Sequence, residues 1–489
     1  MLFNSHIFML LFLPLLLAGW YFLNWKKKFQ LAQGYLIGMS LWFYAYANLQ
    51  YLWLLLFSCL IGWLVSCLPE KIFSEKGKKV LTGVGCVFHL GLLGYFKYSN
   101  FFLENLNTVF HTDFPMLQIL LPVGISFYTF QQLAYLIDRC RGDAPRDSFF
   151  DYLTFMVYFP QLLQGPILLR SEFMGQLKEP ERRRFHAERF SEGIQFFVFG
   201  LAKKVLLADT LAKAVNYGYS NVSMLDSISA LLLAVGYLTE LYFDFSGYCD
   251  MAVGLGKMIG LEVAENFDAP FHSASVKEFW RRWHMTLGRF FTRYVYIPLG
   301  GNRRGKMRTL CNVMIVMLLS GLWHGAAWTF VLWGFLHGVG MIWDNLEHPH
   351  LPKKWMRQAA TFAYVCMTFV FFRAESIAQG IDVLKSIVSL KWNGFVFQMA
   401  SALDMTECYM ITKALSMKLP GLLSWFWLGI FVVLIAICFR VLSGEKVSGV
   451  VALQRQKGYG RLYPVLLAVL FTWSMISMTG VSEYLYFSF

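Results

Sequence analysis

The chain has 489 residues, of which 57% are hydrophobic and only 15% are charged. Soluble domains carry roughly 25% charged residues, so this composition excludes a soluble globular protein and predicts an all-α protein with several membrane spans. The formal net charge is +13, but the basic residues lie between apolar runs, as they do in cytoplasmic loops. We therefore expect no nucleic-acid partner, because the sequence has no basic soluble domain that would bind one.

Apolar runs predict about 11–12 membrane-spanning helices, since a span needs about 20 such residues. The first run, at about 2–24, lacks a basic start and precedes the lysines at 26–28, so it is interpreted as a span and not as a signal peptide. The others lie at about 31–48, 51–68, 80–98, 116–137, 191–208, 227–250, 310–328, 329–345, 359–372, 425–440 and 462–480.

Lysine and arginine alternate between the two sides of this arrangement. The connections at 48–50 and 99–115 are nearly free of basic residues, whereas the loops before and after them are basic. Because basic loops stay in the cytoplasm, both termini are predicted on the outer side of the membrane.

Two regions do not fit simple spans, although the chain shows no repeat or linker and is interpreted as one membrane domain over 1–489. Residues 152–170 contain Pro160, Gly165 and Pro166 between basic flanks, which predicts a re-entrant segment shielded by surrounding protein. Residues 373–424 carry mixed charges and few apolar stretches, which predicts an outward, cap-like insertion.

Several classes of site have no support in the sequence. Nine cysteines occur without Cys-x-x-Cys or Cys/His ligand spacing, which argues against a disulfide framework or a metal site. The sequence has neither a GxxxxGK[ST] phosphate-binding run nor a G-x-S-x-G nucleophile elbow. The stretches 244–247 and 298–302 are interpreted as helix stops. No bound cofactor is predicted.

A histidine within the span at 310–328 is the first candidate for catalysis. His324 is preceded by Trp323 and flanked by the small residues Ser320, Gly321 and Gly325, which allow another helix or a thin substrate to approach. An ionisable side chain in so apolar a helix is costly, and imidazole exchanges protons near neutral pH.

The predicted depth of His324 in the membrane strengthens the hypothesis that it is catalytic. Roughly 22 Å of helix separates it from the cytoplasmic end near Thr309, which places it beyond mid-membrane. A structural role, as a core histidine that donates to a neighbouring carbonyl, remains the alternative. His337, on the next span, is a weaker candidate.

Residues 269–305 combine aromatic and basic side chains in the pattern of a helix that lies at the cytoplasmic interface. The arginines would guide the phosphates of a donor such as an acyl-coenzyme A, or they would anchor the helix to anionic lipids. His284 lies on the apolar side, where a structural role is more common. The apolar face comprises Phe279, Trp283, Leu287, Phe290 and Tyr294, and the arginines are Arg281, Arg282, Arg289 and Arg293.

Two carboxylates lie one helical turn apart in the span at 227–250. Glu240 and Asp244 are at i and i+4, and two carboxylates in a span are costly unless they are paired, hydrated or functional. Structural pairing across the bundle is favoured over the orientation of a catalytic imidazole.

Six long segments together carry a family resemblance. The chain is similar, in order and over nearly its whole length, to the membrane-bound O-acyltransferases, in the bacterial branch that includes alginate O-acetyltransferases and the teichoic-acid D-alanyl transfer protein. The ending YLYFSF at 484–489 is also similar, whereas 373–424 matches no single branch. The segments are PVGISFYTFQQLAYLIDRCRGD (122–143), YFPQLLQGPILLRSEF (158–173), YFDFSGYCDMAVGLGKMIG (242–260), ENFDAPF (265–271), EFWRRWHMTLGRFFTRYVYIPLGGNRRG (278–305) and LSGLWHGAAWTFVLWG (319–334).

The resemblance implies a helical bundle in which a cytoplasmic funnel and an outward opening meet at a thin partition. It implies that His324 is the family's near-invariant intramembrane histidine and that His284 is its second polar position. It also implies that an acyl group moves from a cytoplasmic thioester, acetyl-coenzyme A or an acyl carrier, to a hydroxyl on the outer face.

We therefore expect O-acetylation of an exported cell-surface polysaccharide, at a bacterial cytoplasmic membrane. The acceptor is either the polysaccharide or an extracytoplasmic acetyltransferase of the SGNH type. His324 would act as general base or would itself carry the acyl group. D-alanyl transfer to teichoic acids and transport without covalent chemistry are the alternatives.

Overall fold

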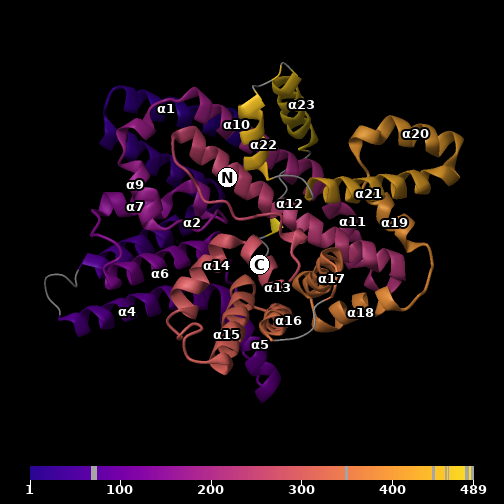
Figure 1. The fold of residues 1–489 in the computed structure, drawn as a ribbon, viewed down its shortest axis with the longest axis horizontal. Coiled ribbons are helices and arrows are strands. Elements are labelled where there is room, and N and C mark those ends of the chain that lie inside the picture. Colours follow the sequence, from indigo (N-terminus) through magenta and orange to yellow (C-terminus); the bar gives the residue numbers. More distant parts are fainter. Residues whose placement is uncertain are drawn as a thin grey trace.

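The computed structural model describes residues 1–67, 74–346, 351–442, 446–457, 460, 462–478 and 484–485. All regular elements within these residues are helices, which confirms the all-α class (Figure 1). Residues 486–489 of the similar C-terminal ending lie outside the described part of the chain.

Six described helices are long and apolar enough to cross a membrane, and the other predicted spans correspond to shorter or more polar helices. The first predicted span corresponds to η1 (Phe8–Phe12) and α1 (Leu13–Trp25). The six segments are Phe8–Trp25, Leu49–Cys67, Glu75–Phe110, Ser227–Ile259, Lys306–His324 and Pro420–Val441.

Helix α2 (Phe29–Cys67) contains the next two predicted spans in one helical element. A straight helix would separate Gln33 from Trp63 by about 45 Å at 1.5 Å per residue. Both nevertheless reach the same short segment: Gln33 Nε2 donates to Asp151 Oδ1 at 2.9 Å, and Trp63 Nε1 donates to the Asp147 carbonyl at 3.2 Å. The axis of α2 is therefore strongly bent between Gln33 and Trp63, within the element that contains both predicted spans.

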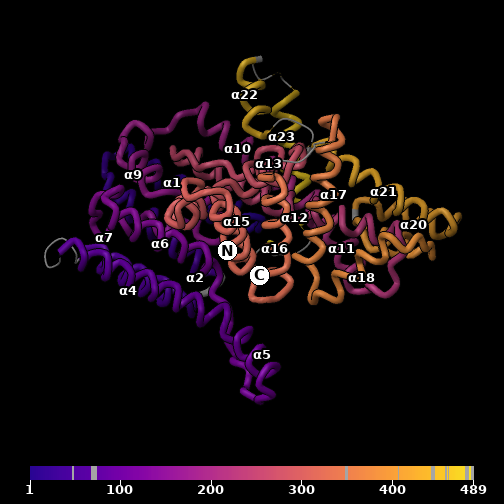
Figure 2. Tube along the Cα trace, turned by 60° about the horizontal axis from the view of Figure 1, so that its bottom comes forward, coloured from indigo at the N-terminus to yellow at the C-terminus, as the bar shows by residue number. Residues whose placement is uncertain are grey.

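One unbroken helix follows, made of α4 (Glu75–Leu93), η2 (Gly94–Tyr98) and α5 (Ser99–Phe110). The prediction of a turn starting at residue 99 is wrong, because a lack of basic residues indicates a side of the membrane and not the end of a helix. Side chains of α5 bond back to the helix, as Asn105 Nδ2 does to the Phe101 carbonyl at 2.6 Å. Helix α5 stands out from the bundle (Figure 2).

Helix α6 (Ile125–Arg141) begins nine residues later than the predicted span at 116–137 (residue 125 instead of 116). Pro122 has no N–H to donate, and Gly124 adopts φ +79°, a conformation that ends regular helix. The helix therefore starts only after both residues.

The segment predicted to be re-entrant is interrupted and buried. Short helices α7 (Phe149–Val157) and α8 (Phe159–Leu162) are followed by a non-helical stretch at 163–169 and by α9 (Arg170–Leu177). Residues 154–168 are buried throughout, so protein shields the broken backbone, as irregular structure in a membrane requires.

The centre of the molecule is α12 (Ser227–Ile259), which packs along α10 (Ala187–Ala202) and η4 (Lys203–Ala208) (Figure 1). The prediction of a helix stop at 244–247 is wrong, because α12 continues through these residues. Gly247 serves helix packing instead: a Cβ there would lie 2.7 Å from the Gly200 carbonyl oxygen. Helices η3 (Pro180–Arg183), α11 (Asp209–Ser220) and η5 (Val222–Met224) complete this region.

Glycines bring the backbones of α10 and α12 into direct contact at two levels. A Cβ on Gly200 would lie 2.5 Å from the Gly247 carbonyl oxygen, and one on Gly193 would lie 2.7 Å from that of Gly254. Small residues permit such close approach in membrane helices, where packing and not the hydrophobic effect holds helices together.

Short helices then lead to the predicted spans at 310–328 and 329–345. They are η6 (Pro270–His272), α13 (Val276–Arg282), α14 (Met285–Phe291) and η7 (Thr292–Tyr296), and the spans are α15 (Lys306–His324) and α16 (Trp328–Asn345).

Most of the remaining helices pack against α12 or α10, and the region predicted as a cap lies at one edge of the bundle (Figure 1). The remaining helices are α17 (Lys354–Arg373), α18 (Ile377–Val388), α19 (Phe395–Ser401), η8 (Thr406–Cys408), α20 (Tyr409–Lys418), α21 (Pro420–Leu442), α22 (Val447–Lys457) and α23 (Leu462–Ser477).

The glycine contacts predict a difference between two otherwise similar substitutions. Gly200→Ala drives a methyl group against a backbone oxygen and should destabilise the protein by about 1–3 kcal/mol. Gly83→Ala, where α4 offers open space, should be neutral or stabilising by up to about 1 kcal/mol. Thermal unfolding of both purified variants in detergent measures the difference, and equal melting temperatures would contradict it.

Candidate active site

His324 is the last residue of α15 and lies at the tip of the hairpin that joins α15 to α16. The two helices pack closely, because a Cβ on Gly321 would collide with the Phe330 carbonyl oxygen and one on Gly334 would lie 2.5 Å from that of Met317. The expected close approach at the small residues is therefore confirmed for Gly321.

The side chain of His324 is buried among aromatic rings, with 3% of the residue exposed. Its ring centroid lies 4.9 Å from that of Trp323, 5.2 Å from Trp333 and 5.1 Å from Phe372. Ser320, one turn earlier, is buried, and Trp323 also stacks on Phe130 with centroids 5.2 Å apart. Of the predicted supporting residues, Trp323 thus forms part of the wall around the imidazole.

His284 also lies in the interior of the protein, at a break in the segment that was predicted to form one helix. It is completely buried and adopts φ +46°, between α13 and α14. Its ring centroid is 6.5 Å from that of His324 and 4.7 Å from that of Phe245 on α12. The two predicted histidines therefore meet, each at a place where a helix is interrupted.

A strap formed by residues 265–268 explains the break at His284. The N–H of Asp268 donates to the Arg282 carbonyl at 2.9 Å, and the N–H of Met285 donates to the Asn266 carbonyl at 3.0 Å. The Asn266 side-chain oxygen also accepts from the Thr286 N–H at 3.0 Å. Because the strap takes these backbone groups, no continuous helix forms through His284.

His337 has a structural role. The Trp280 indole N–H donates to Nδ1 of His337 at 3.2 Å, and Nε2 lies 2.9 Å from the Thr368 hydroxyl. Nδ1 must accept, so the proton sits on Nε2. Both ring nitrogens are thus occupied.

Lys97, in η2, also belongs to this site, although no sequence pattern indicated it. Its ammonium donates to the carbonyls of Trp323 at 2.7 Å and His324 at 2.9 Å. With residues 121–127 and Leu163, these three residues line a cavity of about 50 Å³. The contact joins residues more than 200 positions apart, and no local pattern reports it.

The two predicted carboxylates on α12, Glu240 and Asp244, are buried, and Asp244 is paired. Lys204 Nζ lies 2.6 Å from Asp244 and 2.8 Å from Asp209, and the Leu485 N–H donates to Asp244 at 3.1 Å. These contacts agree with structural pairing for Asp244. Glu240 lies one turn away on the same helix face.

Three of the four predicted phosphate-binding arginines form ion pairs within the protein. Arg282 pairs with Glu278 at 2.8 Å and Arg289 with Glu172 at 2.5 Å. Arg293 pairs with Asp138 at 3.0 Å and with Asp143 at 2.9 Å.

Arg281 differs from the other three. It is exposed, and no ion pair in the described part of the chain involves it.

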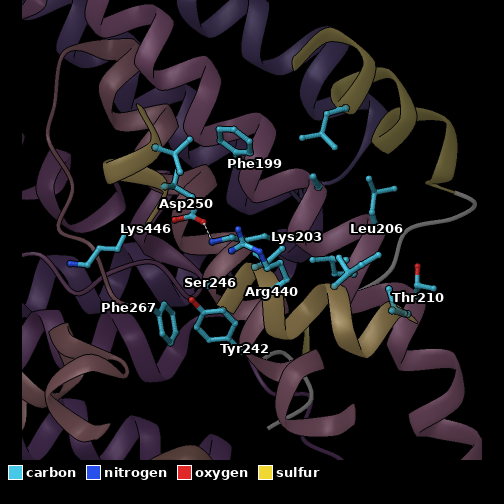
Figure 3. A pocket seen from close by; sticks show the side chains of 18 of the residues that line it. Phe199, Lys203, Leu206, Thr210, Tyr242, Ser246, Asp250, Phe267, Arg440 and Lys446 are labelled. Atoms are coloured by element: carbon cyan, nitrogen blue, oxygen red, sulfur yellow. Dashed lines mark hydrogen bonds and ion pairs between the residues drawn. The ribbon is translucent and has the colours of Figure 1, made fainter. Parts of the chain in front are cut away.

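A larger cavity, of about 680 Å³, lies between the α10–α12 wall and helices α21–α23 (Figure 3). Lys203 and Asp250 point toward each other in its wall, 2.6 Å apart. Asn266 of the strap borders this cavity, but no residue lines both it and the cavity at His324.

Comparisons with known proteins agree with this architecture. The model of the membrane-bound O-acyltransferase family (MBOAT) matches residues 141–380, which include both histidines. The chain is 36% identical over 423 residues to a peptidoglycan O-acetyltransferase of Helicobacter pylori, with 80% of each chain covered. It is 39% identical over 389 residues to a probable alginate O-acetylase of Azotobacter vinelandii, with 77% of this chain and 76% of the relative covered.

More distant relatives transfer a different group. A teichoic acid D-alanyltransferase of Bacillus subtilis is 28% identical over 271 residues, with 52% of this chain and 69% of that protein covered. These comparisons give no support to a transporter without covalent chemistry. The family match, the relatives and the apolar helices show that the chain belongs to the membrane-bound O-acyltransferase family and is a membrane acyltransferase.

Proposed function

We propose that this acyltransferase moves an acetyl group from cytoplasmic acetyl-coenzyme A to the outer face of the membrane, for O-acetylation of a cell-surface polysaccharide. The observation that carries the proposal is the meeting of His284 and His324 inside the protein, 6.5 Å apart at two helix breaks. The O-acetylating relatives, which match over about four-fifths of their length, favour acetyl as the transferred group.

In the proposed reaction His324 acts as the general base. The acceptor hydroxyl gives its proton to the imidazole while its oxygen bonds to the thioester carbonyl carbon. The carbon–sulfur bond then breaks, and the proton passes to the departing thiolate. His284 lines the donor side and positions the thioester. In the alternative, the imidazole takes the acetyl group first and passes it to the hydroxyl.

On the donor side, Arg281 is the arginine that we propose for the coenzyme A phosphates. Its charge is exposed, whereas Arg282, Arg289 and Arg293 already face carboxylates and support the fold. A guanidinium suits phosphate because it offers several donors in one plane.

On the acceptor side, we propose an extracytoplasmic acetyltransferase of the SGNH type as the immediate acceptor or, without it, the polysaccharide. The alternation of basic loops supports a bacterial cytoplasmic membrane with both termini outside.

D-alanyl transfer is the second candidate, because D-alanyltransferases are among the relatives. They match about half of this chain at 28% identity, against more than three-quarters at 36–39% for the acetylating relatives.

Replacement of His324 by alanine tests the proposed site. We expect envelope-bound acetate to fall by about a hundredfold or more, as for the loss of a general base, at unchanged protein abundance. His89→Gln, at another buried histidine in α4, is the control and should keep the activity. Undiminished acetylation by the His324→Ala protein would refute the assignment.

The chemical identity of the ester separates the two candidate donors. Mild alkali should release acetate, and not D-alanine, from the envelope of cells that express the protein, in excess over cells with the His324→Ala variant. Release of D-alanine in that excess would overturn the proposed donor and would retain the family.

Arg281→Ala tests the donor side. We expect the KM for acetyl-coenzyme A to rise several-fold with kcat unchanged, because an exposed cation contributes to the binding of phosphates and not to the chemical step. The difference from wild type should shrink as salt rises from about 0.01 to 1 M, since salt screens exposed charges. A fall in kcat at constant KM would contradict this role.

A further inference from the structure

The end of α15 has a full set of hydrogen-bond partners. A helix leaves its last four carbonyls without partners in the helix. Here Gly325 N–H reaches the Gly321 carbonyl at 3.4 Å, the Tyr98 hydroxyl donates to the Leu322 carbonyl at 2.6 Å, and Lys97 takes the two remaining carbonyls. Two adjacent residues of η2, one neutral and one charged, therefore hold the tip that carries His324.

The contacts of Lys97 distinguish it from three other lysines that are at least partly buried. Lys204 pairs with Asp244, Lys203 with Asp250 and Lys257 with Glu192. No carboxylate forms an ion pair with Lys97 in the described part of the chain. Its contacts are the two carbonyls and, at 3.4 Å, the Ser126 hydroxyl. The partial negative charge at the end of a helix offsets only part of a full positive charge.

This charge faces the space beside the candidate base. Lys97, His324 and Trp323 line the same cavity of about 50 Å³, which has room for about one or two water molecules. Any group that reacts there lies close to the ammonium. The neutral Tyr98 also binds a carbonyl, so carbonyl binding alone does not require a cation.

We propose that Lys97 is a positioning residue for acyl transfer: it fixes the end of α15 that presents His324, and it brings a positive charge to the cavity in which the acyl group reacts. The inference rests on the proposed function. Lys97 lies outside the family match at 141–380, and its role is inferred from its contact with α15.

The chemistry of the transfer explains why a cation is useful there. When the acceptor oxygen bonds to the thioester carbon, the carbonyl electron pair moves to oxygen and the hydroxyl proton moves to His324. The intermediate carries negative charge until the carbon–sulfur bond breaks and the thiolate takes the proton. A fixed cation in a site of low dielectric lowers the energy of that intermediate without reorganisation.

Substitutions at Lys97 and Tyr98 distinguish the effect of the positive charge from the effect of hydrogen bonds that hold the end of α15. Lys97→Gln keeps hydrogen-bond donors without charge, Lys97→Arg keeps both, and Tyr98→Phe removes the neutral bond to the same helix end. Membrane vesicles of the expressing host, which contain the acceptor, are supplied with radiolabelled acetyl-coenzyme A. Incorporation is measured against donor concentration, together with the abundance and melting temperature of each full-length variant.

We expect Lys97→Gln to lower kcat by about a hundredfold while the KM for acetyl-coenzyme A stays within about twofold, which is the effect of losing transition-state stabilisation. Lys97→Arg should recover at least about a tenth of the wild-type kcat, and Tyr98→Phe should keep at least about half, since a neutral hydrogen bond contributes little by comparison.

Three results would overturn the inference: full kcat in Lys97→Gln, an equal loss in Tyr98→Phe, or a loss in Lys97→Gln that appears only in KM. His324→Ala in the same vesicles distinguishes the two levels of the argument. If that variant is fully active, the assignment of His324 as the base fails; if it is inactive while Lys97→Gln is active, only the role of Lys97 fails. Absence of incorporation by the wild-type protein would contradict the proposed function itself.

Discussion

The carbonyl groups at the end of α15 impose the constraint on which the site depends. A helix that ends in apolar surroundings must find partners for these groups, because an unpaired buried carbonyl costs about as much as a lost hydrogen bond. Lys97 and Tyr98 supply them, which fixes η2 beside the tip of α15. His324 is thereby held at a helix end with open space beside it, whereas a histidine in the middle of α15 would face a neighbouring helix. The same solution brings a cation to the site.

His284 is also held by main-chain hydrogen bonds to another segment, the strap at 265–268. At His284 the strap residue Asn266 takes the backbone N–H groups at the start of α14, and Asp268 takes the carbonyl that ends α13. Both histidines thus lie where main-chain hydrogen bonding leaves the helix and passes to a distant segment. Irregular backbone is tolerated at membrane depth only where protein surrounds it, and the complete burial of His284 meets that condition.

The local parts of this architecture were predictable from the sequence, and the distant contacts were not. His324 and its small neighbours stand out because an ionisable residue in an apolar run is rare. A change of direction within α2 was predicted from the loop charges, although its residues form one helical element. The start of α14 depends on Asn266, and the role of Lys97 depends on residues in α15, so neither shows in a local pattern. The arginines at 282, 289 and 293 were interpreted from the helix face that they share. The acidic partners of Arg289 and Arg293, however, come from other elements. The stop predicted at 244–247 failed because Gly247 has a packing partner on another helix.

The glycine contacts have a consequence for motion. Where backbones touch, as in the α10–α12 and α15–α16 pairs, no side chain lies between the helices whose rotamer change would let them slide, and close-packed interiors resist compression. Each pair therefore moves as a rigid block. Relative motion is then left to the connections between such blocks. The turn at 325–327 lies within the α15–α16 block, so His324 moves with that block as a unit. The break at 283–284, by contrast, joins two short helices outside both glycine-packed pairs. The separation of the two imidazoles therefore depends on the backbone at this single break, and a substitution that alters its conformation would change that separation without removing either histidine.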